Sequence, residues 1–281
     1  SFYLLALAAA LAFTGCKKDD SAPVQIVTSD FDPVFAQVLQ QRGYIPDANN
    51  ITTADLAAIT ELDVWGGEGN SPGPLTSLRG IEHSTSLTTL YCGYNLLTDI
   101  DLSQNKALSE LDCSANLLTK LDVSQNPALT ELSCSENHLT KLDVSQNTAL
   151  MVLNCDLNQL TELDLSQNTE LTELSCDYNE LTELEVSANT KLTDLWCNNN
   201  QLTKLDVSDN TKLETLWCFS NQLESLDLSA NTKLETLSCN NNPGDGISTF
   251  PVTAWFDNQS IPDALLYQSS WEYDGKTITI N

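Results

Sequence analysis

Apolar positions recur along most of this chain with a period of 21 residues. One repeat, starting at Leu108, reads LSELDCSANLLTKLDVSQNPA, and the next, starting at Leu129, reads LTELSCSENHLTKLDVSQNTA. Leu111 and Cys113 are two positions apart, so in a β-strand both side chains point to one face and the residue between them points to the other. The first half of each repeat therefore predicts a short strand with one apolar side.

The second half of each repeat has the same alternation, with Leu121 and Val123 on one side and Asp122 on the other. A single repeat cannot bury its own apolar sides, so stability requires stacked copies. The pattern predicts a parallel-stranded β-solenoid over 87–242, in which every coil offers two short strands that face each other across a thin core.

Two other residue types follow the same period. Eight of the nine cysteines occupy one inward position, where packing in the core is the favoured interpretation and disulfides or a bound metal are the alternatives; they are Cys92, Cys113, Cys134, Cys155, Cys176, Cys197, Cys218 and Cys239. Two asparagine ladders mark the turns, where each asparagine is expected to bond the backbone of its own turn and its copy in the next coil. The first ladder is Asn95, Asn116, Asn137, Asn158, Asn179, Asn200, Asn221 and Asn242, and the second is Asn105, Asn126, Asn147, Asn168, Asn189, Asn210 and Asn231.

The two half-repeats, LxxLxCxxN and LxxLDVSxN, both match the leucine-rich-repeat strand pattern LxxLxLxxN. The chain thus resembles the nested 21-residue class of bacterial leucine-rich repeats, called IRREKO repeats. The resemblance implies a β-rich, right-handed, parallel-stranded solenoid, and it implies recognition of a protein partner.

Both ends of a solenoid need a cap. Residues 31–86 are predicted to form a small helical cap and a degenerate first repeat, because Asp32-Pro33 is typical of a helix start, Val34, Phe35, Val38 and Leu39 form an apolar stripe, and Gly43 is typical of a helix end. A second short helix is expected after Thr53. Relatives often have a calcium loop between these helices, but Asp47–Ile51 lacks the glycine and the later acidic ligands, so no calcium is expected there.

Residues 243–281 are predicted to form the C-terminal cap. Segments 270–273 and 276–280 flank Asp274-Gly275, which is a strong signal for a β-hairpin. Four aromatic residues are assigned to the packing of this cap: Trp255, Phe256, Trp271 and Tyr273.

The first residues are typical of a targeting segment. Residues 2–13 form an apolar run that ends near Cys16, and this resembles a bacterial lipobox whose cysteine is lipidated. Residues 1–16 are therefore interpreted as a lipoprotein signal peptide and 17–30 as an acidic tether. The run Lys17-Lys18-Asp19-Asp20 resembles the Bacteroidetes signal for export to the outer face of the outer membrane. A secretory segment with a chance cysteine, followed by a polar linker, is the alternative.

Charge and motif content restrict the function. The formal net charge of −27 disfavours nucleic acid and favours basic proteins, divalent cations or neutral glycans as partners. No catalytic motif is present and His83 and His138 are the only histidines, so neither an enzyme nor a cofactor is expected. An acidic ladder is either a solvated face or a weak site for divalent cations, and it consists of Asp101, Asp122, Asp143, Asp164, Glu185, Asp206 and Asp227.

The outward positions beside each cysteine break the repeat. Trp196 and Trp217 occupy the same position in consecutive coils, and Phe219 lies two residues beyond Trp217. Exposed aromatic side chains usually mark a contact surface, and Asp177, Asp194 and Asn198 supply polar groups beside them. We expect these residues to form the binding site, although the C-terminal cap is an alternative cover for them. The predicted function is adhesion or protein recognition by a lipid-anchored monomer, with glycan capture for nutrient uptake as the alternative.

Overall fold

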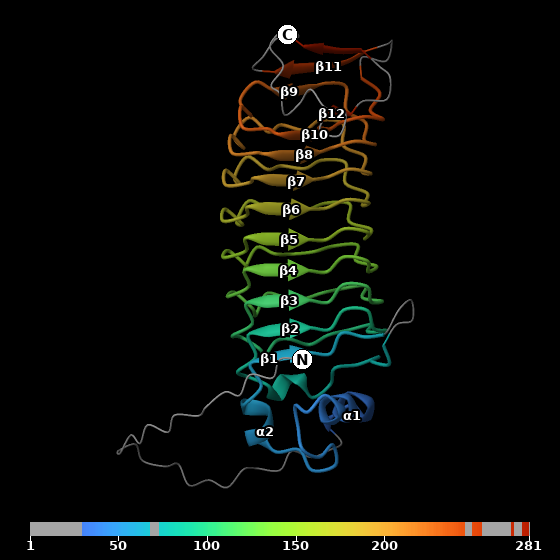
Figure 1. Ribbon diagram of the computed structural model, residues 1–281, viewed down its shortest axis with the longest axis vertical. Helices are drawn as coiled ribbons and strands as arrows, with labels where there is room; N and C mark the ends of the chain where they lie inside the picture. The colour runs from blue at the N-terminus through green and yellow to red at the C-terminus, as the bar shows by residue number, and fades with distance from the viewer. Residues whose placement is uncertain (1–29, 68–72, 245–248, 255–270, 273–276, 281) are drawn as a thin grey trace, which may run out of the picture.

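The computed structural model describes residues 30–67, 73–244, 249–254, 271–272 and 277–280. Figure 1 shows an elongated stack of coils with helices at one end. Within the described residues, no helix is long and apolar enough to cross a membrane. The predicted signal peptide and tether lie outside them, apart from residue 30, as do Trp255, Phe256, Tyr273 and the Asp274-Gly275 turn.

The N-terminal cap forms as the sequence predicts. Helix α1 spans Pro33–Gln41, and its start is fixed by Asp32, whose carboxylate accepts hydrogen bonds from the amides of Val34 and Phe35. Helix α2 spans Thr53–Ala57 and begins with a capping box between Thr52 and Asp55. Phe35, Ala36, Val38 and Leu39 are buried against the first coils, whereas Val34 is exposed. A short 3-10 helix, η2, follows at Ile81–His83.

One parallel sheet runs along the whole stack. Its ten strands lie in the order β1-β2-β3-β4-β5-β6-β7-β8-β10-β12, and Leu111 of one coil is in register with Leu132 of the next. The strands are β1 (Glu61–Asp63), β2 (Thr89–Tyr91), β3 (Glu110–Asp112), β4 (Glu131–Ser133), β5 (Val152–Asn154), β6 (Glu173–Ser175), β7 (Asp194–Trp196), β8 (Thr215–Trp217), β10 (Thr236–Ser238) and β12 (Trp271–Glu272). We call its outer side the strand face (Figure 1).

The prediction of a second strand in every coil is wrong for most coils. Among the described second halves only β9, Leu226–Leu228, is a strand, although the inward residues are buried throughout, as Val123 shows with no exposed surface. Isolated backbone bonds, such as the one from the amide of His138 to the carbonyl oxygen of Leu118, join the coils there together with side-chain bonds. The carbonyl oxygen of Leu102, for example, accepts from the side-chain nitrogen of Asn126 at 3.1 Å and from the amide of Asn105 at 3.0 Å.

The asparagine ladders bond neighbouring coils, but each ladder makes only part of the predicted set of bonds. The side-chain nitrogen of Asn137 donates to carbonyl oxygens of its own turn and to that of Cys113 in the preceding coil, each at 3.1 Å, while its Oδ1 accepts from the amide of Leu118 at 2.9 Å. Asn147, in the second ladder, donates to Val123 and Asn126 of the preceding coil. These asparagines are buried, so each bond stabilises the stack in a place that water does not reach.

The prediction of a C-terminal β-hairpin is wrong. Strand β12 pairs parallel with β10, whereas β13, Thr277–Ile280, pairs parallel with β11, Thr249–Ala254, which in turn pairs with β9. The two predicted hairpin strands therefore lie in different sheets. Apolar residues alternate in the same way in a hairpin strand and in a strand that pairs with the solenoid, so the pattern did not distinguish the two. Here each strand extends one of the two parallel sheets.

Candidate functional site

The cysteine ladder belongs to the core. The eight cysteines from Cys92 to Cys239 are buried thiols, with at most 1% of any side chain exposed. Burial raises the pKa of the thiols from Cys92 to Cys218 well above the usual range, so these thiols stay protonated. The prediction of core packing is confirmed. Over the part of the chain that the structure describes, no group of three or more His, Cys, Asp or Glu side chains is placed to hold a metal ion.

The acidic ladder of the second halves binds its own backbone. Oδ1 of Asp122 accepts from the amide of Ser124 at 2.9 Å, and the same bond recurs in most of the other coils. Hydrogen bonds from the serine lower the pKa of Asp122, so the carboxylate is stabilised in its charged form. This geometry gives each aspartate a local role in its turn.

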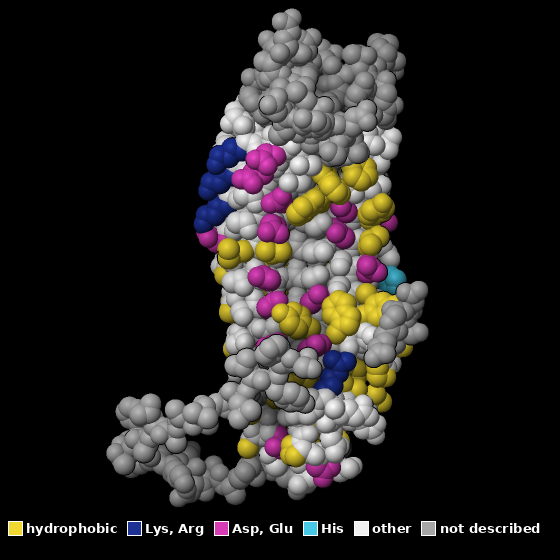
Figure 2. All heavy atoms as spheres, in the orientation of Figure 1, with side chains coloured by type: hydrophobic (Ala, Val, Ile, Leu, Met, Phe, Trp, Pro, Cys, Tyr) yellow, Lys and Arg dark blue, Asp and Glu magenta, His cyan; other side chains and the backbone are white. Residues whose placement is uncertain are grey.

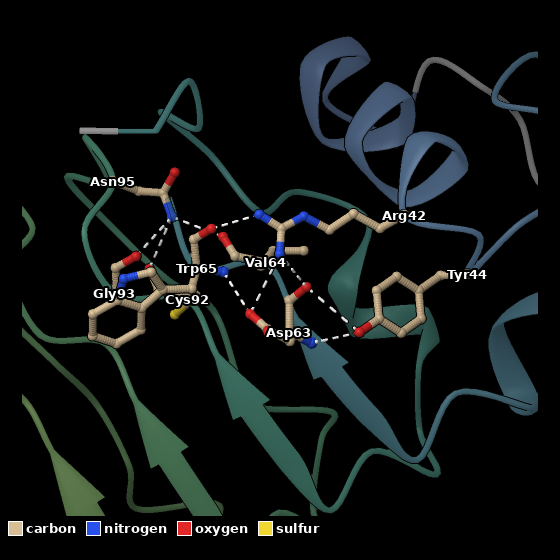
Figure 3. Close-up of polar contacts among 8 residues, drawn as sticks. All are labelled: Arg42, Tyr44, Asp63, Val64, Trp65, Cys92, Gly93 and Asn95. Atoms are coloured by element: carbon tan, nitrogen blue, oxygen red, sulfur yellow. Dashed lines mark hydrogen bonds and ion pairs between the residues drawn. The ribbon is translucent and has the colours of Figure 1, made fainter. Parts of the chain in front are cut away.

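The helical cap is fastened to the first coil by the contacts in Figure 3. Arg42 donates from Nη1 to the carbonyl oxygen of Asp63 at 2.9 Å and from Nη2 to that of Trp65 at 2.5 Å. The hydroxyl of Tyr44 accepts from the amide of Asp63 at 2.8 Å. These side chains are committed to joining the cap to β1, so we assign this cluster to the fold.

The strand face differs from coil to coil, and three of its aromatic residues lie together near the C-terminal end, whereas Tyr91 lies apart from them in β2. Trp196 and Trp217 are register partners in β7 and β8, and the ring centroids of Trp217 and Phe219 are 6.3 Å apart. Trp217 remains 38% exposed, and Trp196 and Phe219 are half-buried. Figure 2 shows hydrophobic side chains over this part of the strand face, with acidic side chains beside them. We call Trp196, Trp217 and Phe219 the aromatic patch.

The predicted polar residues lie beside the aromatic patch, but they differ in their surroundings. Asp177 is half-buried, and its Oδ1 accepts from the amide of Asn198 at 2.8 Å. Asn198 is 2% exposed, and its Oδ1 accepts no hydrogen bond from any residue in the described ranges. Asp194 accepts from the hydroxyl of its neighbour Thr193. Asn198 is therefore a buried supporting residue, whereas Asp177 and Asp194 are partly exposed.

Sequence reasoning did not select three further residues that belong here, namely Asn154, Asp156 and Ser175. Asn154 and Ser175 line a shallow depression of about 320 Å³ together with Asp177 and Trp196. Ser175 donates to Oδ1 and Oδ2 of Asp156 at 2.7 and 2.8 Å, and the amide of Asp177 donates to Asp156 at 2.7 Å. The available signal was register, since Asp156 and Asp177 occupy the same position in consecutive coils. The C-terminal segment 255–270, proposed above as an alternative cover, lies outside the described residues.

Comparisons with known proteins agree with this architecture. Residues 211–250 match the family model described as leucine rich repeats (2 copies). The chain is 32% identical to the functional domain of InlJ from Listeria monocytogenes, which includes a cysteine ladder, with a TM-score of 0.64; the match covers 93% of this chain and 62% of that one. The chain thus spans less than two thirds of that relative's length. No curated protein matches the chain significantly.

Two further solved structures share the fold. Internalin C2 from Listeria monocytogenes is 22% identical, with a TM-score of 0.67, and 78% of this chain and 100% of that chain are covered. The leucine-rich effector protein YopM from Yersinia pestis is 24% identical, with a TM-score of 0.54, over 79% of this chain and 56% of that one. The chain therefore contains leucine-rich repeats, and its structure is a leucine-rich-repeat solenoid with internalins among its structural neighbours.

Proposed function

We propose that this chain is a non-enzymatic recognition protein whose strand face binds a basic protein partner through the aromatic patch. The observation that carries the proposal is the pairing of Trp196 with Trp217 in adjacent strands while Trp217 remains 38% exposed. Tryptophan is enriched among residues that dominate binding energy at protein interfaces. A net charge of −27 favours a partner of opposite charge, because complementary charge speeds association.

The repeat itself supports a role in binding. Other coils place serine at the position of the two tryptophans, namely at Ser133, Ser175 and Ser238, and those coils stack with the same register. The fold therefore does not require a large aromatic side chain there. Two tryptophans in neighbouring coils therefore add exposed apolar surface that the stacking of the coils does not require.

The test replaces both tryptophans with the serine that other coils carry. Trp196→Ser/Trp217→Ser should keep the circular dichroism spectrum of the folded protein but lose the basic proteins that the wild-type chain captures from a cell-surface extract. Met151→Thr is the matched control, because Met151 is 46% exposed and Thr130 and Thr172 hold the equivalent positions in the adjacent coils. Equal capture by the double serine variant and the wild type would contradict the proposal.

We further propose, from the N-terminal sequence, that the protein is a Bacteroidetes-type lipoprotein displayed on the outer membrane as a monomer and anchored by a lipid on Cys16. Cys16→Ala should move the protein from the membrane fraction to the soluble fraction, because the acyl chains supply the anchoring energy. Protease added to intact cells should degrade the wild-type protein. Retention of the Cys16→Ala variant in the membrane would contradict the anchor, and protection from protease would contradict surface display.

A second candidate function is glycan capture, because the indole of Trp196 lines a depression that also contains Asn154 and Ser175. A sugar ring can stack on an indole while amide and hydroxyl groups bond its hydroxyls. A glycan array probed with the wild-type chain and with Trp196→Ser tests this function. Array signals that vanish in the variant, together with no capture of basic proteins, would favour the glycan function over the protein function.

A further inference from the structure

The depression beside Trp196 has the size and walls of a socket for one side chain. It lies across strands β5, β6 and β7, with Val152 and Trp196 as apolar walls and Glu173 and Asp177 as acidic ones. Its volume of about 320 Å³ is at the lower end of the range for small-molecule sites. A space of this size can hold a single amino-acid side chain.

The two acidic walls are not neutralised by the protein. Asp156, just behind them, has both carboxylate oxygens occupied by Ser175 and by the amide of Asp177. Asp177, by contrast, receives hydrogen bonds from Asn198 and from no other described residue. Neither Glu173 nor Asp177 forms an ion pair with a lysine, arginine or histidine of the described ranges. The socket therefore offers carboxylate oxygens that still lack a cationic partner.

The surroundings of Asp177 disfavour its charge. Burial, and then the neighbouring carboxylate of Asp156, raise the pKa of Asp177 to about 7. The other titratable groups around it are Glu173, which lines the same depression, and the thiols of Cys155, Cys176 and Cys197, which burial keeps protonated. A cation placed in the socket would offset this accumulation of negative charge.

We propose that the socket receives an arginine side chain of the protein partner, with the guanidinium stacked on Trp196 and hydrogen-bonded to Asp177 and Glu173. This inference rests on the proposed protein-binding function and names the chemistry of its partner. Arginine fits better than lysine because its planar guanidinium both stacks on an indole and presents a fork of donors to a carboxylate. The strongly negative charge of the chain favours the same occupant over a neutral sugar.

The experiment uses Nα-acetyl-arginine amide as the probe and its citrulline analogue, which is uncharged but of similar shape, as the control ligand. Binding is followed by the NMR signal of the Trp196 indole N–H, assigned by its loss in Trp196→Ser. The arginine probe should shift this signal with millimolar affinity, and the citrulline probe should bind at least about tenfold more weakly, since charge-assisted bonds are the stronger ones. Asp177→Asn should weaken arginine binding by a similar factor.

A control variant and a pH series make the result specific. Asp164→Asn removes an aspartate of the second half of a repeat and should leave arginine binding unchanged. Because the bound cation favours the ionised carboxylate, affinity should fall about fivefold from pH 8 to pH 6 in the wild type, and by less in Asp177→Asn. Equal binding of arginine and citrulline, or a stronger response of Trp196 to methyl glucoside, would overturn the inference.

The outcome separates this inference from the proposed function. If Trp196→Ser/Trp217→Ser abolishes capture of the protein partner while Asp177→Asn captures it as the wild type does, the patch binds protein but the arginine socket is refuted. If the arginine probe binds as described and no basic protein is captured by the wild type, the socket stands and the proposed protein function fails.

Discussion

The two halves of each repeat have nearly the same consensus but behave as two different surfaces. The first half forms a continuous parallel sheet, and its outward residues differ from coil to coil. The second half keeps aspartate or glutamate at one outward position through seven coils and is a strand only at β9 in the described coils. The outward side chains of the sheet take no part in its backbone bonds and can vary, whereas the outward aspartates of the second halves accept hydrogen bonds from their own turns.

Aspartate shows the same contrast. In the second half, Asp122 accepts bonds from Ser124 and its pKa is lowered, so the turn favours the charged form. In the first half, burial raises the pKa of Asp177, so the folded protein disfavours its charge. A carboxylate whose charged form is stabilised by its own turn has a structural role. A carboxylate whose charged form is disfavoured in the folded protein is a candidate for binding a ligand.

The largest expected effect concerns the core that both halves share. In a protein lacking Cys16, a thiol reagent at pH 8 should find no reactive thiol in the folded state and eight in denaturant, because the cysteines from Cys92 to Cys239 are buried thiols. Titration with Ellman's reagent measures both numbers. Fewer than eight thiols in denaturant without reductant would reveal disulfides and refute the packing of this core.

The next largest effects are expected for two single variants, each of which removes one asparagine from one of the two ladders. Asn137→Ala deletes an amide nitrogen whose two hydrogens are shared among three carbonyl oxygens, and one accepted bond, and should lower the free energy of unfolding by about 3–4 kcal/mol. Asn147→Ala deletes two donated bonds, and its Oδ1 has no donor among the described residues, so about 2 kcal/mol is expected. Urea unfolding followed by circular dichroism compares them, and the reverse order would contradict the stronger bonding assigned to the first ladder.

A smaller and pH-dependent effect is expected for Asp177→Asn. The folded pKa of about 7 lies above the unfolded value, so the folded state binds more protons between them and stability falls as the pH rises through this window. Removing the carboxylate should stabilise the protein by about 1–2 kcal/mol at pH 8, after allowance for its partial exposure, and by almost nothing at pH 4.

Asp143→Asn is the control for that prediction, because its pKa is lowered by Ser145. Its stabilising contribution is present above the unfolded pKa and disappears as the pH falls through the folded one. This variant should therefore be slightly less stable than the wild type at pH 8 and indistinguishable at low pH. Thermal melts at both pH values measure the two variants together, and a gain for Asp143→Asn at pH 8 would remove the contrast between the halves.

The sequence was sufficient for the stacking, the buried cysteines and part of the asparagine bonds, because each follows from a fixed period and from alternation in a strand. It did not distinguish a strand from an extended segment, since Leu121 and Val123 alternate in the same way as Leu111 and Cys113. It also gave no signal for the left-handed backbone before each first-ladder asparagine, which Leu157 and Tyr178 adopt with φ of 53° although neither residue type favours it.

The candidate site was predictable only in part, for a related reason. The aromatic patch stands out because Trp196 and Trp217 break a repeat. The depression depends on side chains from three coils, and Asn154 and Ser175 are ordinary polar residues at positions where most coils carry something similar. Which of them share a hollow is set by side-chain packing between coils, and no single repeat contains that information.

The central claim is that the aromatic patch, and not the second-half surface, meets the partner. Hydroxyl-radical footprinting of the chain with and without a captured basic protein reads this directly from side-chain oxidation. We predict that the partner lowers the oxidation of Trp217 and Phe219 severalfold while Met151, exposed in an earlier coil, changes little. Unchanged oxidation of Trp217 and Phe219 in the complex, with protection elsewhere on the solenoid, would contradict the account.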